Sequence, residues 1–301
     1  MDTRTITPAR LAESVIAVPP LARDSNLRID KAENQRLVTF IEAGGVTSLL
    51  YGGNAVFYHL RLSEYARVLQ TLVDIVADGT LVVPAVGPAF GTMMDQAEVL
   101  QDFDFPTVMI LPQREIADPA GIATGIRRFV EAYGHPIVLY LKHDRWLPPE
   151  LIAKMYRSGT INWIKYAVVR DDPSDDVYLR EVLAEIPSEI VVSGIGEQPA
   201  ITHMRDFEIQ SFTSGCVCVN PGRSMDMLRA IQAKDYVQAE AIRKQFLGLE
   251  DLRNYINPIR VLHRAVELAS IAATGPMYPM LGELTAEQTT QVARAAADLL
   301  P

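Results

Sequence analysis

The sequence is poor in cysteine and lacks long apolar runs, and each shortage excludes a class of protein. Only two cysteines, Cys216 and Cys218, occur in 301 residues, and their spacing cannot support an ordinary disulfide framework. No run reaches the roughly 18 apolar residues that a membrane-spanning helix needs, and the first residues do not resemble the apolar segment of a signal peptide. We therefore expect a soluble, cytoplasmic protein without disulfides.

Positive charge is also scarce. Lysine and arginine number 28 against 37 aspartates and glutamates, which gives a net charge of −9. Nucleic acids and anionic membranes are bound by clustered lysine and arginine, so we expect neither as a partner. What the chain does have is a large apolar share, 49% of its residues. That share is typical of a folded protein with one large domain, or one large and one small domain.

Eight short apolar runs rich in β-branched residues divide the first three quarters of the chain. They recur about every 29 residues, the length of one strand-helix unit with its crossover. Both faces of each run are apolar, as in parallel strands that helices cover. The eight runs predict a closed (β/α)8 barrel. They begin near Ser14, Val46, Thr80, Thr107, Pro136, Ile161, Glu189 and Ser214.

The segments between the runs have helical spacing and start signals. Residues 63–76 place their apolar side chains on one stripe, and Ser63 is expected to be the N-cap. Asp118 followed by Pro119 predicts another helix start. The rival fold, an open doubly wound sheet, would need a glycine-rich phosphate loop after its first strand. Residues 19–30 contain no glycine, which favours the barrel.

After Asn220 the sequence predicts helices and no further strand. We therefore expect residues 1–223 to form the barrel and residues 224–301 to form a helical C-terminal extension. The expected helices cover residues 224–232, 235–252, 258–273 and 285–300.

The most informative polar residue is Lys165, which interrupts the sixth apolar run, INWIKYAVV. Active sites of (β/α)8 barrels lie at the carboxyl ends of the strands. Burial there lowers the pKa of a lysine and frees its amine to attack a carbonyl group, so Lys165 is a candidate for Schiff-base formation. The residues alone leave two other interpretations open: an inward lysine paired with a carboxylate, or a lysine that faces outward between helices.

Two neighbouring strand ends carry further candidates. Tyr140 closes the fifth run, where its phenol could transfer protons or simply pack. Gly52, Gly53 and Asn54 follow the second run. Their backbone could approach a ligand closely and hold a carboxylate by N–H groups, or form an ordinary tight turn.

Other polar or sulfur-bearing residues carry weaker signals. His59 could reach the site as a general acid or base, but a peripheral role is the more common one for such a residue. His143 and Asp144 do not have the spacing of a metal site, so no metal is expected. Cys216 and Cys218 are expected to share one face of the eighth strand and to pack in the core.

Five segments, in order, resemble the dihydrodipicolinate synthase and N-acetylneuraminate lyase superfamily. These proteins are pyruvate-type class I aldolases on a (β/α)8 barrel with a helical C-terminal extension. IAVPPL resembles the opening strand, and FIEAGGVTSLLYGGNAV the second-strand segment that ends in Gly-Thr-Thr-Gly-Glu. PIVLYLKHDR resembles Leu-Tyr-Asn-x-Pro-x-Arg, and INWIKYAVVRDD the segment with the Schiff-base lysine. NPIRVLHRAVEL and GPMYPMLGELT resemble the tail with its Asn-Pro and Pro-x-x-Pro-Leu motifs.

The resemblance assigns roles by position. It implies that Lys165 forms the Schiff base and that Tyr140 shuttles protons. Arg145 matches the arginine that meets the second substrate's carboxylate in dihydrodipicolinate synthases, although a surface arginine is an equal alternative. Gly53 and Asn54 replace two hydroxyl residues of the synthases. Asparagine at the second place is similar to the 4-hydroxy-2-oxoglutarate aldolase branch, so we expect these two residues to bind the substrate's carboxylate.

The implied function is that of a lyase that forms a Schiff base with pyruvate or a related 2-oxo acid and makes or breaks a C–C bond. It needs no cofactor other than the covalent bond to Lys165. Dehydration of a 2-keto-3-deoxy sugar acid by the same chemistry is an alternative. A non-catalytic role in small-acid binding or regulation is another, because a hydroxyl of the proton relay is missing.

Further departures from the family pattern bear on pathway and assembly. Gln113-Arg114 stands in place of a Tyr-Tyr pair, and Ile195-Gly196-Glu197 in place of an acidic motif. These departures argue against a role in lysine biosynthesis. The family's usual assembly implies a homo-oligomer, a dimer or a tetramer.

Overall fold

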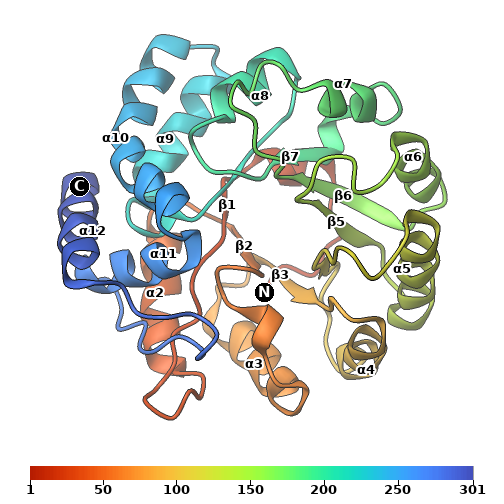
Figure 1. The fold of residues 1–301 in the computed structure, drawn as a ribbon, viewed down its shortest axis with the longest axis horizontal. Coiled ribbons are helices and arrows are strands. Elements are labelled where there is room, and N and C mark those ends of the chain that lie inside the picture. The colour runs from red at the N-terminus through yellow and green to blue at the C-terminus, as the bar shows by residue number, and fades with distance from the viewer. Residues whose placement is uncertain (301) are drawn as a thin grey trace.

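The computed structural model describes residues 1–300, and its centre is a barrel of eight parallel strands (Figure 1). The strands pair in the order β7-β6-β5-β4-β3-β2-β1-β8. A parallel bridge between Ser193 and Phe212 joins β7 to the residue before β8 and closes the ring. The predicted (β/α)8 barrel is confirmed. Its strands are β1 (Ile16–Ala17), β2 (Ser48–Tyr51), β3 (Leu81–Val86), β4 (Met109–Ile110), β5 (Ile137–Leu141), β6 (Ile161–Tyr166), β7 (Val191–Ser193) and β8 (Thr213–Ser214).

Helices surround the strands, as Figure 1 shows. The short helix α1 (Pro8–Ala12) precedes β1, and one helix of the outer ring follows each strand. The ring consists of α2 (Lys31–Ala43), α3 (Leu62–Ile75), α4 (Phe90–Leu100), α5 (Pro119–Tyr133), α6 (Pro149–Arg157), α7 (Val177–Leu183), α8 (Ala200–Asp206) and α9 (Pro221–Gln232). Three more helices complete the chain: α10 (Tyr236–Tyr255), α11 (Pro258–Leu268) and α12 (Ala286–Leu299).

The strands form where the apolar runs were predicted because both of their faces are buried. All six residues of β3 are buried, as are five of the six residues of β6. A helix on the outside and other side chains on the inside cover each strand, so apolar residues are needed at successive positions. Against this background Lys165 is the one residue within β6 that can carry a positive charge.

The eighth strand is shorter than predicted, and this corrects the expected placement of the cysteines. The strand ends at Ser214, where the Val217 N–H donates a hydrogen bond to Ser214 Oγ at 3.0 Å and turns the chain. Cys216–Cys218 then forms the 3-10 helix η3. The two cysteines therefore do not share a strand face, although both are buried and unpaired.

The helix starts also differ in part from expectation. Ser63 is not the N-cap of α3, because the helix begins one residue before it and Arg61 occupies the cap position without a side-chain hydrogen bond. The other predicted cap is confirmed: the carboxylate of Asp118 accepts a hydrogen bond from the Gly121 N–H at 3.0 Å, with Pro119 in the first turn.

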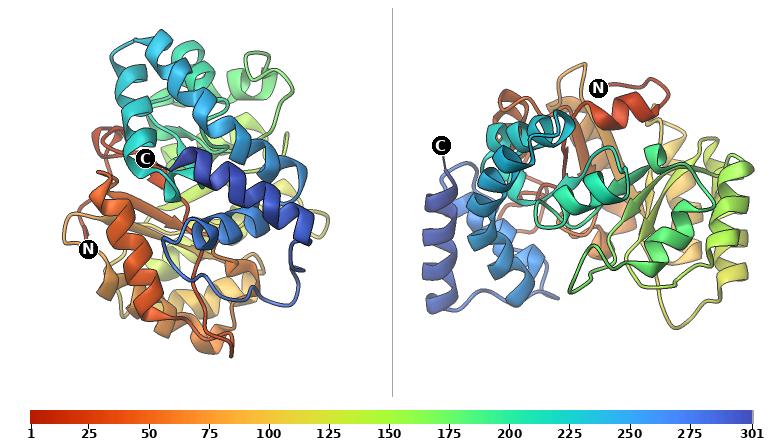
Figure 2. Two further views of the ribbon diagram at one scale, coloured as in Figure 1. Left: turned by 90° about the vertical axis from the view of Figure 1, so that its left-hand side faces the viewer. Right: turned by 90° about the horizontal axis from the view of Figure 1, so that it is seen from above.

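The C-terminal helices pack on one side of the barrel (Figure 2). Helix α10 contacts α9, α11 and α12, and it also reaches α8 and η3. The expected boundary between residues 223 and 224 falls inside α9, which contacts α2 and α8 and takes the eighth place in the ring. We propose a boundary after α9, with α10–α12 as the extension. Pro301 lies outside the described residues.

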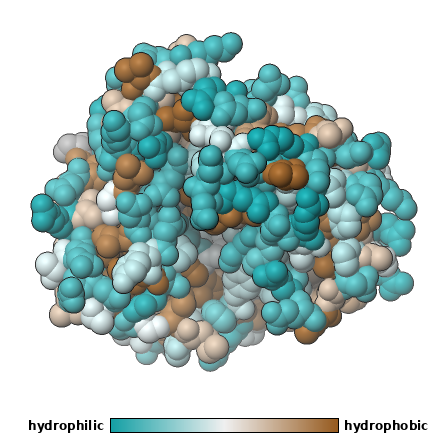
Figure 3. All heavy atoms as spheres, turned by 45° about the horizontal axis from the view of Figure 1, so that its top comes forward, coloured by the Kyte–Doolittle hydropathy of each residue, from teal (hydrophilic) through white to brown (hydrophobic). Residues whose placement is uncertain are grey.

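The helices and one face of the molecule can be compared with what a membrane-spanning or strongly apolar protein would show. No helix within residues 1–300 is both long enough and apolar enough to cross a membrane. The face in Figure 3 is mostly hydrophilic, and its apolar side chains lie in small separate groups.

Candidate active site

A cavity of about 210 Å³ opens at the carboxyl ends of the strands, where barrel enzymes have their active sites. Of the five predicted site residues, Lys165, Tyr140, Gly53 and Asn54 line it, and Arg145 does not. Other lining residues come from the ends of β7 and β8 and from the C-terminal helices. They include Gly194, Thr213, Gly215, Arg253 and Pro258.

Lys165 projects from β6 into this cavity, and only 5% of its surface is exposed. Burial lowers the pKa of its amine to about 7, and the positive charges of Arg253 and Lys142 act in the same direction. No carboxylate within residues 1–300 forms an ion pair with it. Neither alternative interpretation of this lysine fits the structure, because it faces neither a carboxylate nor the outer solvent. A partly neutral, enclosed amine is suited to nucleophilic attack on a carbonyl.

Tyr140 lies beside Lys165 on the neighbouring strand. The two residues are in register across β5 and β6, and Lys165 Nζ lies 4.7 Å from the centre of the Tyr140 ring. Burial raises the pKa of the Tyr140 phenol, and the nearby Tyr58 hydroxyl adds to this effect. The phenol is thus protonated near neutral pH and can donate a proton. His59, by contrast, is exposed in the 3-10 helix η1 (Phe57–His59) and does not line the cavity.

The loop after β2 lines the cavity with Gly53 and Asn54. Among residues 1–300, no acceptor is hydrogen-bonded to the N–H of Gly53 or Asn54. A side chain built on Gly53 would meet nothing within 4 Å, so the backbone there is open to a ligand. These two N–H groups are therefore available to an anion.

Two hydrogen bonds hold this loop in place. The Asn54 side chain donates from Nδ2 to the Val18 carbonyl at 2.9 Å, at the end of β1. His263 Nε2 lies 2.9 Å from the Asn54 carbonyl. Burial lowers the pKa of His263 to about 4, so the ring is neutral and Nε2 carries the donated hydrogen.

Arg145 lies elsewhere. Its guanidinium is exposed and makes a two-pronged ion pair with Glu181, at 2.7 and 2.9 Å. Its backbone φ of 51° lies in the left-handed region. The prediction that Arg145 binds substrate is not supported by this geometry.

Arg253 and His263, both in the C-terminal helices, contribute to the site and were not predicted. Arg253, in the last turn of α10, lines the cavity, and His263, in α11, fixes the Asn54 loop. Their helical pattern shows which face is buried but not that this face meets the barrel's open end. The only usable signal was their position on either side of the Asn-Pro motif.

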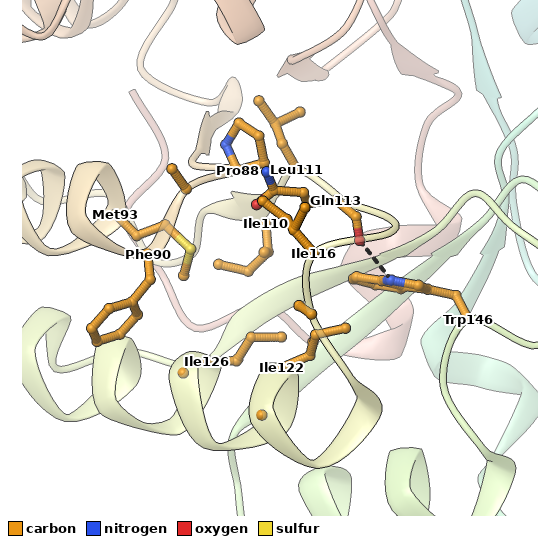
Figure 4. Close-up of a pocket in the computed structure, with 14 residues that line it drawn as sticks. Pro88, Phe90, Met93, Ile110, Leu111, Gln113, Ile116, Ile122, Ile126 and Trp146 are labelled. Atoms are coloured by element: carbon orange, nitrogen blue, oxygen red, sulfur yellow. Dashed lines mark hydrogen bonds between the residues drawn. The ribbon is translucent and has the colours of Figure 1, made fainter.

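A second cavity, of about 300 Å³, lies against α4 and α5 (Figure 4). Its wall is almost entirely apolar, and the indole N–H of Trp146 donates to the Gln113 carbonyl at 3.0 Å on one side. None of its lining residues is titratable. This cavity therefore has no group for acid-base or nucleophilic chemistry.

Comparisons with known proteins agree with the fold of this chain. No family model matches the chain. A Methanosarcina barkeri 4-hydroxy-tetrahydrodipicolinate synthase is 26% identical, over 92% of this chain and 94% of its own length. A Pseudomonas putida strain F1 protein named "Probable 5-dehydro-4-deoxyglucarate dehydratase" is 24% identical over 86% of each chain. The crystal structure of Bacillus clausii dihydrodipicolinate synthase superposes with a TM-score of 0.85 at 24% identity, covering 97% of this chain and 99% of that one.

The closed barrel, the buried amine at its open end and these relatives together support a lyase. In sequence and in fold the chain is similar to proteins of the dihydrodipicolinate synthase superfamily over nearly its whole length. The resemblance seen in the sequence is thereby confirmed.

Proposed function

We propose that Lys165 condenses with the keto group of pyruvate or a related 2-oxo acid. The observation that supports this most directly is an amine only 5% exposed with a pKa lowered to about 7. Nζ would attack the keto carbon, and loss of the keto oxygen as water would leave an iminium. That iminium accepts the electron pair of a bond broken at the adjacent carbon.

Tyr140 would supply and recover the protons. Its phenol donates a proton to the departing oxygen of the carbinolamine, which leaves as water. The phenolate then takes the proton of the substrate hydroxyl while the C–C bond breaks, an aldehyde departs, and the electron pair moves into an enamine. Protonation of the enamine carbon and hydrolysis of the resulting iminium release the 2-oxo acid. The N–H groups of Gly53 and Asn54 hold the acid's carboxylate during these steps.

Dehydration is the second candidate. The same iminium acidifies the hydrogen on the adjacent carbon, and loss of a hydroxyl from the next carbon as water completes the reaction. The names of relatives from Pseudomonas putida, P. entomophila and P. fluorescens, all "Probable 5-dehydro-4-deoxyglucarate dehydratase", favour this possibility.

The test is reductive trapping. The protein is incubated with pyruvate and other 2-oxo acids in the presence of cyanoborohydride, and the adduct is located by intact mass and peptide mapping. We expect one adduct, on Lys165, and none in Lys165→Arg, which keeps the positive charge and all other lysines. An unmodified Lys165 with every acid would contradict the proposal.

Turnover then separates the candidate reactions. Pyruvate release from a 2-keto-3-deoxy sugar acid would indicate C–C cleavage, and a dehydrated product would indicate the dehydratase. Trapping of 2-oxo acids without turnover of any such substrate would favour the binding or regulatory role.

The remaining proposals concern cofactors, assembly and location. We propose no metal and no cofactor besides the covalent bond to Lys165, because the iminium itself accepts the electrons. We propose a homo-oligomer, a dimer or a tetramer, because Phe90 and Ile116 on the rim of the apolar cavity are 46% and 75% exposed (Figure 4). Sedimentation showing only monomer at micromolar concentration would contradict this. A cytoplasmic location without nucleic-acid or membrane partners stays a prediction from composition.

A further inference from the structure

Arg253 reaches from α10 of the C-terminal extension into the mouth of the barrel. Gly215, which has no side chain, lies between Arg253 and the Asn54 amide. A Cβ placed on Gly215 would lie 2.8 Å from Arg253 Nη2 and 3.1 Å from Asn54 Nδ2. The guanidinium and the Asn54 amide therefore flank the same point, beside the loop with the free N–H groups.

The charge of Arg253 is not neutralised by the protein. Its nearest acceptors are weak: Cys216 Sγ lies 3.8 Å from Nη1, and the Pro258 carbonyl lies 3.4 Å from Nε. No carboxylate of the described chain comes within 4.0 Å of it. Glu250, one turn earlier, instead accepts the Glu197 N–H at 2.9 Å, and burial raises the pKa of Glu250 well above its ordinary value, which favours the neutral acid.

The cavity as a whole lacks negative charge. Its lining includes the basic side chains of Lys142, Lys165 and Arg253, and no aspartate or glutamate. The Gly53 and Asn54 positions offer backbone N–H groups but no hydroxyl. An unpaired guanidinium in an enclosed site is a strong binder of carboxylate, because its planar fork can donate two parallel hydrogen bonds.

The position of Arg253 near Lys165 indicates which carboxylate of the ligand it would bind. In a 2-oxo acid the carboxylate is bonded directly to the keto carbon, so an acid joined to Lys165 must place its carboxylate next to Nζ. Arg253 is near enough for its charge to be the second cause, after burial, that lowers the pKa of Lys165. A carboxylate between the two would meet the guanidinium on one side and the Gly53 and Asn54 N–H groups on another.

We propose that Arg253 binds the carboxylate of the 2-oxo acid whose keto carbon becomes bonded to Lys165. This inference rests on the proposed Schiff-base function and adds a specificity residue to it. The barrel supplies the amine and the N–H groups, and the C-terminal extension supplies the positive charge that selects acids over neutral ketones.

The test compares a charged and a neutral ketone of the same size. The rate of cyanoborohydride trapping is measured against the concentration of pyruvate and of its methyl ester, at about pH 9, where a lysine with a pKa near 7 is neutral with or without a neighbouring cation. Arg253→Met should raise the half-saturating pyruvate concentration about 10- to 100-fold and leave the value for the ester unchanged. Arg253→Lys should recover part of the loss.

Arg243→Met is the matched control, because Arg243 lies on the same helix outside the cavity and pairs with Glu240. It should leave both half-saturating concentrations unchanged. No adduct in the unmodified protein would contradict the Schiff-base function itself. If the unmodified protein forms the adduct and Arg253→Met has the same half-saturating pyruvate concentration, only the present inference is overturned. The same holds if Arg253→Met raises the half-saturating concentrations of pyruvate and of its methyl ester equally.

Discussion

The amine of Lys165 lies 4.7 Å from the centre of the Tyr140 ring, and the two residues face each other in register on β6 and β5. Neighbouring strands of the barrel thus hold the proposed nucleophile and the proposed proton donor together without help from a loop. Burial shifts their pKa values in opposite directions, lowering that of the amine and raising that of the phenol. Near neutral pH much of the amine is free base and the phenol is protonated, the combination that imine formation requires.

The first prediction concerns pH. Because only the neutral amine attacks a ketone, the initial rate of trapping at saturating pyruvate should rise with pH and reach half its maximum near the Lys165 pKa of about 7. Lys142→Met should move this midpoint upward, since the positive charge of Lys142 lowers the pKa of Lys165. A midpoint near about 10, the value of a solvated lysine, would contradict the buried amine.

The second prediction concerns stability. The folded-state pKa of Lys165 lies below its unfolded value, so between about pH 7 and about pH 10.5 the unfolded chain binds the extra proton. Stability is therefore lost as pH falls through this range. Lys165→Met should increase the free energy of unfolding by roughly 2–4 kcal/mol near neutral pH, measured by urea denaturation. The gain should shrink at about pH 9.5, and a destabilised variant at neutral pH would count against the prediction.

The candidate residues on the strands were predictable because the apolar runs locate the strands, and the carboxyl ends of the strands locate the site. An ionisable residue inside an apolar strand has to face either the barrel's interior or its helices, which made Lys165 conspicuous. The eighth run shows the limit of this reasoning. Its alternating valines and cysteines favour a strand, but the hydrogen bond from Val217 to Ser214 Oγ turns the chain after two strand residues.

The contribution of the C-terminal extension was not predictable. An arginine on an amphipathic helix is ordinarily a surface residue, and the spacing around Arg253 gives no sign that α10 ends over the barrel's mouth. The prediction that Arg145 binds substrate differs from the structure for the converse reason. Its spacing from Tyr140 matches the family motif, but the local backbone and the ion pair with Glu181 hold it at the surface.

The third prediction tests proton transfer. Tyr140→Phe removes the phenolic hydroxyl and keeps the ring beside Lys165. Exchange of the pyruvate methyl hydrogens with deuterated solvent, followed by NMR, should slow by about 10²- to 10⁴-fold, while the trapped adduct still forms on prolonged incubation. Tyr58→Phe is the comparison, because Tyr58 also lines the cavity. Equal losses in the two variants would show that Tyr140 is not the specific proton carrier.

The last prediction concerns His263, which connects the extension to the anion-binding loop. His263→Phe removes the donor to the buried Asn54 carbonyl and should cost about 1–3 kcal/mol of stability, with a higher half-saturating pyruvate concentration as the loop loosens. His263→Gln, whose amide can donate in the same direction, should restore much of both.

The pH dependence distinguishes this hydrogen bond from simple packing. Burial lowers the pKa of His263 to about 4. Between about pH 6.5 and about pH 4 the histidine is therefore protonated in the unfolded chain but not in the folded chain, and stability is lost as pH falls through that range. The stability of the unmodified protein should therefore fall more steeply than that of His263→Gln between about pH 7 and about pH 5, as measured by denaturation at each pH. Parallel pH profiles for the two proteins would show that His263 is not the neutral donor to Asn54.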